Sequence, residues 1–259
     1  MKRPAPRSIS GFTLVELLVV VGIIAILGSL MMAAYSSAMI SGRTAASMSN
    51  LRQLAEANIT YTSDHNGSYC PAQDITNNYR WHGARTSGSA WDPSKGYLSP
   101  YLGTDGRVKM CPLFANMVKD GASFETGAGG YGYNEIYIGG TPANNFQPTT
   151  ITNVPNPART VMFTTTAFAV ATGLQEYPFS EAYQWVDPNY NLDGGLQPSV
   201  HFRAHGRALV AWCDGHVSAE LPAQLGGADY YGGNSAKANI GWFGPSDNNG
   251  YWNPAYTGP

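Results

Sequence analysis

One carboxylate near the start of an otherwise uncharged, mostly apolar run constrains this chain more than any other feature. The run covers residues 11–40, and the carboxylate is Glu16. An ionised side chain at bilayer depth costs about 2.5 to 3.5 kcal/mol, so a partner or a function must compensate for it. The natural partner is the amine of a new N-terminus. A plain membrane anchor, for which residues 17–40 supply the roughly 20 apolar residues required, has no reason to retain this glutamate.

The N-terminus resembles the class III signal of type IV prepilins and type II secretion pseudopilins. Gly11 is followed by Phe12-Thr13-Leu14-Val15-Glu16, behind a leader that carries Lys2, Arg3 and Arg7. The resemblance implies that a prepilin peptidase cuts after Gly11, that Phe12 becomes the methylated first residue, and that Glu16 becomes the fifth residue of the mature chain. It also implies two further partners, an inner-membrane assembly platform and other pilin-like subunits, which the N-terminal helix contacts.

Charge placement predicts the orientation in the membrane. The cations of the leader precede the apolar run, and the first cation after it is Arg43. Positive charges favour the cytoplasmic side, so we expect a single-pass inner-membrane protein with a cytoplasmic N-terminus. Everything after residue 40 is then exported, into the periplasm or an extracellular filament. An ordinary secretory signal peptide, cleaved near Ser29 or Ser47 at a small-residue site, is the alternative.

The composition fits an exported globular domain. Charged residues make up 12% of the 259 residues, the formal net charge is -2, and there are 30 glycines and 16 tyrosines. These values exclude a disordered, acidic or basic tail and give no nucleic-acid footprint. We expect four segments: a leader over residues 1–11, a transmembrane and assembly helix over 12–40, its amphipathic continuation over 41–66, and an exported β-rich domain over 67–259.

The apolar pattern continues beyond the membrane span at helical spacing. Leu51, Leu54 and Ile59 fall on one face, and polar residues take the other faces. This predicts one long helix that stops near Asn66 and Gly67, because Asn-Gly supplies a left-handed terminator. The apolar stripe needs a sheet to cover it, so we predict an α+β fold. The resemblance implies its pilin-like version, in which a long N-terminal helix, half in the membrane, packs on an antiparallel β-sheet with extended loops.

Short apolar segments punctuated by glycine, proline and asparagine predict the strands of this sheet. The candidates are residues 108–111, 131–133, 160–164 and 208–213. Asp214-Gly215 after the last of them is a strong hairpin signal, and both faces of 208–213 are apolar, as in a central strand. This region also resembles the C-terminal H-x(9)-D-G signature of prepilin-like proteins, although eight residues separate His205 from Asp214.

The sequence predicts neither a catalytic residue nor an enzyme. The motifs G-x-S-x-G and H-E-x-x-H and the phosphate-binding glycine loop are absent. His201, His205, Asp214 and His216 have metal-ligand residue types, but the hairpin turn accounts for the last two, so we expect no metal. Calcium at residues 247–250 is the alternative: Asp-Asn-Asn-Gly has suitable residue types without the spacing of a calcium loop, and a turn explains it as well.

Export places Cys70, Cys111 and Cys213 in an oxidising compartment, where an accessible pair is expected to join. We predict a Cys70–Cys111 disulfide, since each of the two precedes a proline at the edge of an element. Cys213 is then free, as a small buried hydrophobe in an apolar strand. A bridge between Cys111 and Cys213 is the alternative.

Aromatic residues recur in pairs over residues 230–256. Such side chains fill the core of a glycine-rich β domain, and exposed ones stack on sugars or on a partner protein; we favour the core.

The features combine to predict a structural subunit of a type II secretion pseudopilus or a type IV pilus-like filament. The alternative is a single-pass anchored binding module that displays its exported domain and never polymerises.

Overall fold

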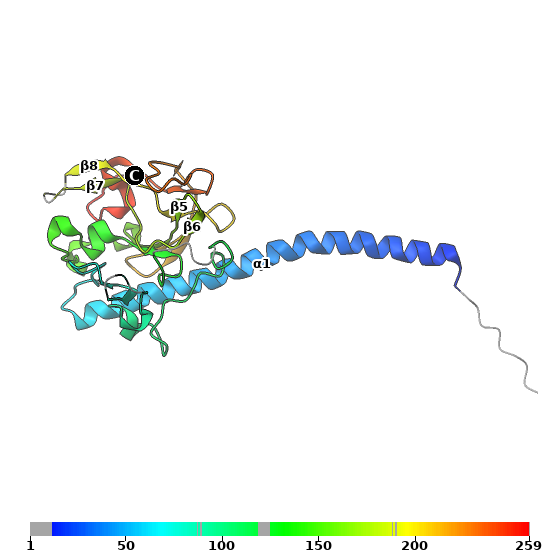
Figure 1. Cartoon of the computed structure of the whole chain (residues 1–259), viewed down its shortest axis with the longest axis horizontal. Coiled ribbons are helices and arrows are strands. Elements are labelled where there is room, and N and C mark those ends of the chain that lie inside the picture. The colour runs from blue at the N-terminus through cyan, green and yellow to red at the C-terminus, as the bar shows by residue number, and fades with distance from the viewer. Residues whose placement is uncertain are drawn as a thin grey trace, which may run out of the picture. The chain divides into compact units, whose positions relative to one another are not determined.

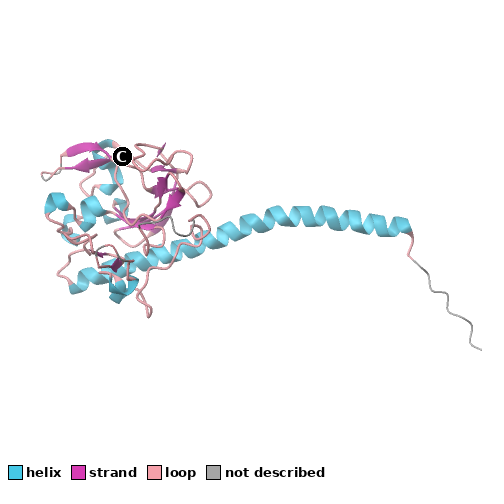
Figure 2. Cartoon of the chain, viewed as in Figure 1, coloured by secondary structure: helices cyan, strands magenta, loops and turns pink. Residues whose placement is uncertain are grey.

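The fold is given by a computed structural model that describes residues 12–86, 88, 90–118, 125–187, 189 and 191–258. It is an α+β structure in which a long N-terminal helix is followed by antiparallel sheets, as the sequence predicts. The chain divides into two units, Met1–Ser41 and Gly42–Pro259. Figure 2 shows that the second unit consists of short strands joined by long loops, together with helical segments.

Helix α1 spans Leu14–Asp64 and runs through both units (Figure 1). Its N-terminal part is long and apolar enough to cross a membrane, and the large apolar side chains there are exposed. The helix ends where Asn66 and Gly67 predict: their φ angles are 53° and 81°, and the Gly67 N–H donates to the Thr62 carbonyl at 2.8 Å. This is the left-handed termination that glycine favours.

The central sheet of the second unit has four antiparallel strands in the order β11-β10-β4-β3. They are β3 (Tyr131–Tyr133), β4 (Val161–Thr165), β10 (Ala208–Trp212) and β11 (Val217–Glu220). All of β10 is buried and it has a strand on each side, as predicted for a central strand. β10 and β11 form a hairpin in which Ala211 lies opposite Val217.

Both faces of the central sheet are covered. On one face, Leu209 of β10 belongs to the apolar cluster that includes Leu54 of α1. On the other face, Val210 belongs to a second cluster that includes Trp242 and Trp252. Successive side chains of a strand point to opposite faces, so β10 contributes alternately to the two clusters. Of the aromatic residues over 230–256, Trp242, Phe243, Trp252 and Tyr256 are buried, whereas Tyr230 and Tyr231 are exposed.

The remaining described strands form one three-stranded sheet, in the order β12-β13-β9, and three antiparallel pairs. Their bounds are β1 (Tyr79–Arg80), β2 (Gly83–Ala84), β5 (Phe168–Val170), β6 (Gly173–Gln175), β7 (Gln184–Val186), β8 (Leu192–Gly195), β9 (Val200–His201), β12 (Gln224–Leu225) and β13 (Ile240–Trp242). Short 3-10 helices span Pro93–Lys95, Ser99–Tyr101, Pro142–Asn144, Ile151–Asn153, Pro157–Arg159 and Asp247–Trp252, and a π-helical turn spans Glu135–Gly139.

The prediction of a strand at residues 108–111 is wrong. This segment has no regular secondary structure, and Lys109 and Met110 are exposed. It is tied to its surroundings through the Cys111 N–H, which donates to the Gly129 carbonyl at 2.8 Å. Residues 108–111 pair with none of the described strands, and Pro112, which follows them, has no N–H with which to extend a ladder.

Candidate functional site

The N-terminal site is described from Phe12 onward, because Gly11 lies outside the described residues. Phe12 is 82% exposed and precedes the helix. The Thr13 N–H donates to Glu16 Oε2 at 2.9 Å, and the Glu16 N–H donates to Thr13 Oγ1 at 3.3 Å. This reciprocal pair is a capping box. It holds the carboxylate at the start of α1, four residues after Phe12, the predicted N-terminus of the mature chain.

Asp214 and Gly215 shape the turn between β10 and β11. The Asp214 Oδ1 accepts the backbone N–H of His216 at 3.0 Å, and the Gly215 N–H donates to the Trp212 carbonyl at 2.9 Å. Gly215 has a φ of 89°, a conformation that a side chain disfavours. These two residues therefore have a structural explanation as turn residues.

Of the four residues with metal-ligand side chains, Asp214 and His216 lie together in the hairpin turn, whereas His201 and His205 lie elsewhere. Among the described residues, no group of three or more His, Cys, Asp or Glu side chains is placed to hold a metal. His201 is buried, its Nδ1 lies 3.1 Å from Arg203 Nη1, and burial together with this guanidinium keeps the pKa of His201 well below its usual range. His216 Nδ1 instead lies 2.6 Å from Asp214 Oδ1 in the hairpin turn, and His205 occupies another turn with a φ of 52°.

Asn249 joins the turn at residues 247–250 to hairpin β7–β8. Its Oδ1 accepts the Gln184 N–H at 2.8 Å, and its Nδ2 donates to the Gln184 carbonyl at 2.9 Å and to the Tyr137 hydroxyl at 3.0 Å. The Asn249 amide is thus bonded through both its oxygen and its nitrogen. Calcium at this turn remains the alternative that the sequence left open.

The three cysteines are free and buried, so the expected disulfide between Cys70 and Cys111 is absent from this structure. Cys111 Sγ lies 3.2 Å from Ser47 Oγ, whereas the Cys70 N–H donates to Asn58 Oδ1 at 2.9 Å. Positions 47 and 58 are about 16 Å apart along α1 at 1.5 Å per residue, and a disulfide needs Cα atoms within about 7 Å. Cys70 is also buried and does not lie at an accessible edge.

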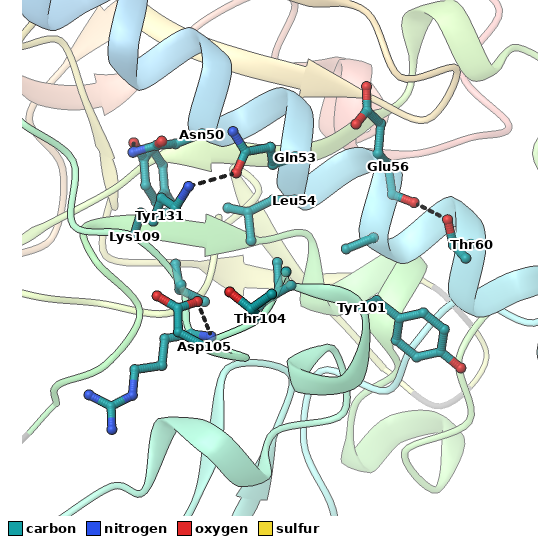
Figure 3. A pocket seen from close by; sticks show the side chains of 15 residues that line it. Asn50, Gln53, Leu54, Glu56, Thr60, Tyr101, Thr104, Asp105, Lys109 and Tyr131 are labelled. Carbon is teal, nitrogen blue, oxygen red and sulfur yellow. Dashed lines mark hydrogen bonds between the residues drawn. The ribbon is translucent and has the colours of Figure 1, made fainter.

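A groove of about 480 Å³ lies between α1 and residues 101–109. Figure 3 shows Lys109 reaching toward the helix, where its Nζ donates to Gln53 Oε1 at 3.3 Å. The lining includes the buried Leu54 and Tyr131. Charged side chains of both signs, among them Asp105 and Lys109, line the same groove.

Glu135 and Glu181 carry buried carboxyl groups that the sequence pattern does not reveal. Gln73 Nε2 donates to Glu135 Oε1 at 2.9 Å, and the Tyr177 hydroxyl donates to Glu181 Oε1. Burial raises the pKa of Glu181 to about 7. Burial and then the Glu181 charge raise the pKa of Glu135, against the opposing effect of Arg80. No spacing rule pointed to either glutamate, because their burial depends on the tertiary structure.

A second, open groove of about 730 Å³ lies at hairpin β7–β8 and β13. Its lining includes Tyr183, Trp242 and the exposed Tyr230. The aromatic residues over 230–256 were the available sequence signal for Tyr230 and Trp242, whereas Tyr183 lies outside that run. Sequence alone did not separate the two buried rings from the exposed one.

Comparison with known families identifies the N-terminal segment. A model of the prokaryotic N-terminal methylation motif matches residues 6–32. The chain therefore carries a prepilin-type N-terminus. The motif marks it as a substrate of prepilin peptidase and implies assembly with other pilin-like subunits. The matched residues do not extend to the region around His205 and Asp214. Neither the search of curated proteins nor the search of solved structures found a match.

Proposed function

We propose that this prepilin-like protein is a structural subunit of a type II secretion pseudopilus or a type IV pilus-like filament. The observation that carries the proposal is the methylation motif at residues 6–32 joined to a helix able to span a membrane. Glu16 is the acidic residue of the first helical turn. Anchoring alone gives no reason to keep an acidic residue there, so it favours assembly.

In the proposed assembly, Phe12 is the methylated N-terminus and Glu16 pairs with the Phe12 amine of a neighbouring subunit. Each charge would be costly at bilayer depth without the other, and pairing offsets part of both desolvation costs. The inner-membrane assembly platform is the proposed partner that delivers the subunit. Residues 67–259 are proposed to be the exported domain, and residues 12–40 the transmembrane and assembly helix.

Processing is the direct test. Mass spectrometry of protein extracted from membranes is expected to give a chain that starts at N-methylated Phe12. Gly11→Val should leave the full-length precursor, because the peptidase then lacks the glycine on the leader side of the bond. A mature chain that begins near Ser29 or Ser47 would instead establish an ordinary signal peptide and refute the proposal.

A further inference from the structure

The open groove at hairpin β7–β8 has a rigid aromatic floor. The rings of Tyr183 and Trp242 stack with centroids 5.1 Å apart. Trp242 Nε1 donates to the Ala182 carbonyl at 3.0 Å, and the Tyr183 hydroxyl donates to the Gly244 carbonyl at 2.9 Å. With their polar atoms bonded to the backbone, the two rings, which are 8% and 3% exposed, form a fixed apolar base beneath the groove.

Tyr230 forms an exposed wall of the same groove, and it is held at two points. Its side chain is 68% exposed. Its backbone N–H donates to Oε1 of the buried Gln197 at 2.9 Å, and its hydroxyl donates to the carbonyl of Gly195 in β8 at 3.3 Å. An exposed ring fixed at both ends loses little conformational entropy when a ligand stacks on it, which is the advantage of preorganisation.

Polar side chains with free hydrogen-bonding capacity complete the lining. Within the described part of the chain, the side-chain amide of Gln184 and the hydroxyl of Ser246 have no hydrogen-bond partner, and the Asp247 side chain accepts one bond, from the Tyr256 hydroxyl at 3.4 Å. Hairpin β7–β8 and the C-terminal segment that supply these side chains lie side by side (Figure 1). An amide, a hydroxyl and a carboxylate together offer donors and acceptors over an apolar floor.

The charge of the lining selects the class of ligand. Among the described residues that line this groove, none is a lysine or an arginine, and Asp247 is the one carboxylic acid. Phosphates and uronic acids would therefore meet a carboxylate with no cation to balance them, which is unfavourable. The groove between α1 and residues 101–109 differs, because Arg107 and Lys109 line it.

We propose that the groove at hairpin β7–β8 binds a neutral saccharide. A sugar ring has apolar C–H faces and a hydroxyl-rich edge. Its C–H face would stack on the exposed ring of Tyr230, and its hydroxyls would bond to Gln184, Ser246 and Asp247. A site of this kind, with apolar surface and a few placed polar groups, has the usual composition of a small-ligand pocket. The proposal does not depend on incorporation into a filament, so it goes beyond the proposed function.

Binding can be tested by isothermal titration calorimetry on the full chain, in a detergent without a sugar headgroup. The probes are cellohexaose, laminarihexaose and chitohexaose, with hexagalacturonate as the anionic control. At least one neutral probe is expected to bind with a Kd below about 10 mM, and hexagalacturonate at least tenfold more weakly, where tenfold is about 1.4 kcal/mol. Ligand binding should also change the fluorescence of the protein, since Trp242 lines the groove.

Substitutions of two adjacent tyrosines localise the site. Tyr230→Ala should weaken binding by about tenfold or more, and Tyr230→Phe, which retains the ring, by less than about threefold. Tyr231→Ala is the matched control, because Tyr231 is also exposed but does not line the groove. Circular dichroism should show the same fold for all three variants. The proposal is overturned if none of the neutral probes binds, if hexagalacturonate binds as tightly, or if Tyr230→Ala binds as the unmodified chain does.

Discussion

Glu16 has one observed role and one proposed role, and substitutions can separate them. Its side chain caps the start of α1 through Thr13, and its charge is available to pair with an N-terminal amine. A glutamine at the same position can still cap the helix, but it carries no charge. The local role and the assembly role therefore make different demands on this one residue.

We predict that Glu16→Ala and Glu16→Gln both prevent incorporation into filaments while leaving cleavage largely intact. The reason is that an unpaired amine remains at bilayer depth when the carboxylate is lost. Mass spectrometry of the processed chain measures cleavage, and co-purification with sheared filaments measures incorporation. Normal incorporation of Glu16→Gln would show that the helix cap, and not the charge, is what the residue supplies.

The buried Glu181 should make stability depend on pH. Its pKa is raised in the folded state. The contribution of the protonated Glu181 to the free energy of unfolding is therefore fully present below about pH 4 and is lost as the pH rises through about 7. Buried His82 and His201, whose pKa values are lowered, act in the opposite direction over the same range. The test therefore compares the protein with Glu181→Gln, which cannot ionise.

We predict that the free energy of unfolding of Glu181→Gln, relative to the unmodified chain, rises by roughly 2 kcal/mol between pH 5 and pH 8. Denaturant unfolding at both pH values measures the difference. Gln73→Ala serves as a comparison, since it removes the donor to Glu135 without removing an ionisable group. A difference that stays constant with pH would mean that Glu181 does not titrate in this range.

Among the elements, turn residues predicted where α1 ends and where the β10–β11 hairpin turns, whereas the sequence did not predict contacts between distant segments. The end of α1 at Asn66-Gly67 and the hairpin at Asp214-Gly215 follow from the φ angles that these turn residues adopt, so a few residues of sequence suffice. The segment at 108–111 has strand-like residues, but a strand also requires a neighbour, which its sequence does not specify. The same applies to Cys70 and Cys111, because separation along the chain says little about distance in the fold.

Strand β3 shows how closely the elements pack. A Cβ atom at Gly132 would lie 2.4 Å from Thr166 Cγ2 and 2.6 Å from the Phe179 carbonyl carbon, whereas a Cβ at Gly195 in β8 meets nothing within 4 Å. We predict that Gly132→Ala lowers the free energy of unfolding by about 1 to 3 kcal/mol. Gly195→Ala should change it by less than about 0.5 kcal/mol. Thermal melting distinguishes the two, and equal effects would contradict the close approach at β3.

At the scale of the whole molecule, the C-terminal segment completes the second apolar cluster, the one that includes Trp242 and Trp252. Trp252 is fully buried, and its Nε1 donates to the Ser180 carbonyl at 3.0 Å. We predict that Trp252→Ala lowers the free energy of unfolding by about 3 to 5 kcal/mol. Trp252→Phe should cost less, because most of the ring volume is retained. Denaturant unfolding measures both variants. A small decrease in the free energy of unfolding for Trp252→Ala would show that the C-terminal segment contributes little to the stability of the domain.

The alternation of side chains along β10 has a consequence for cooperativity. Neighbouring residues of this one strand belong to the two apolar clusters. Unfolding of either cluster would therefore displace β10 and expose apolar side chains of the other cluster to water. Residues 42–258 are then expected to melt in a single transition, the behaviour of a two-state domain. A molecule that binds at Trp242, in the second cluster, would by mass action raise the melting temperature of the whole domain, including the contact between α1 and the central sheet.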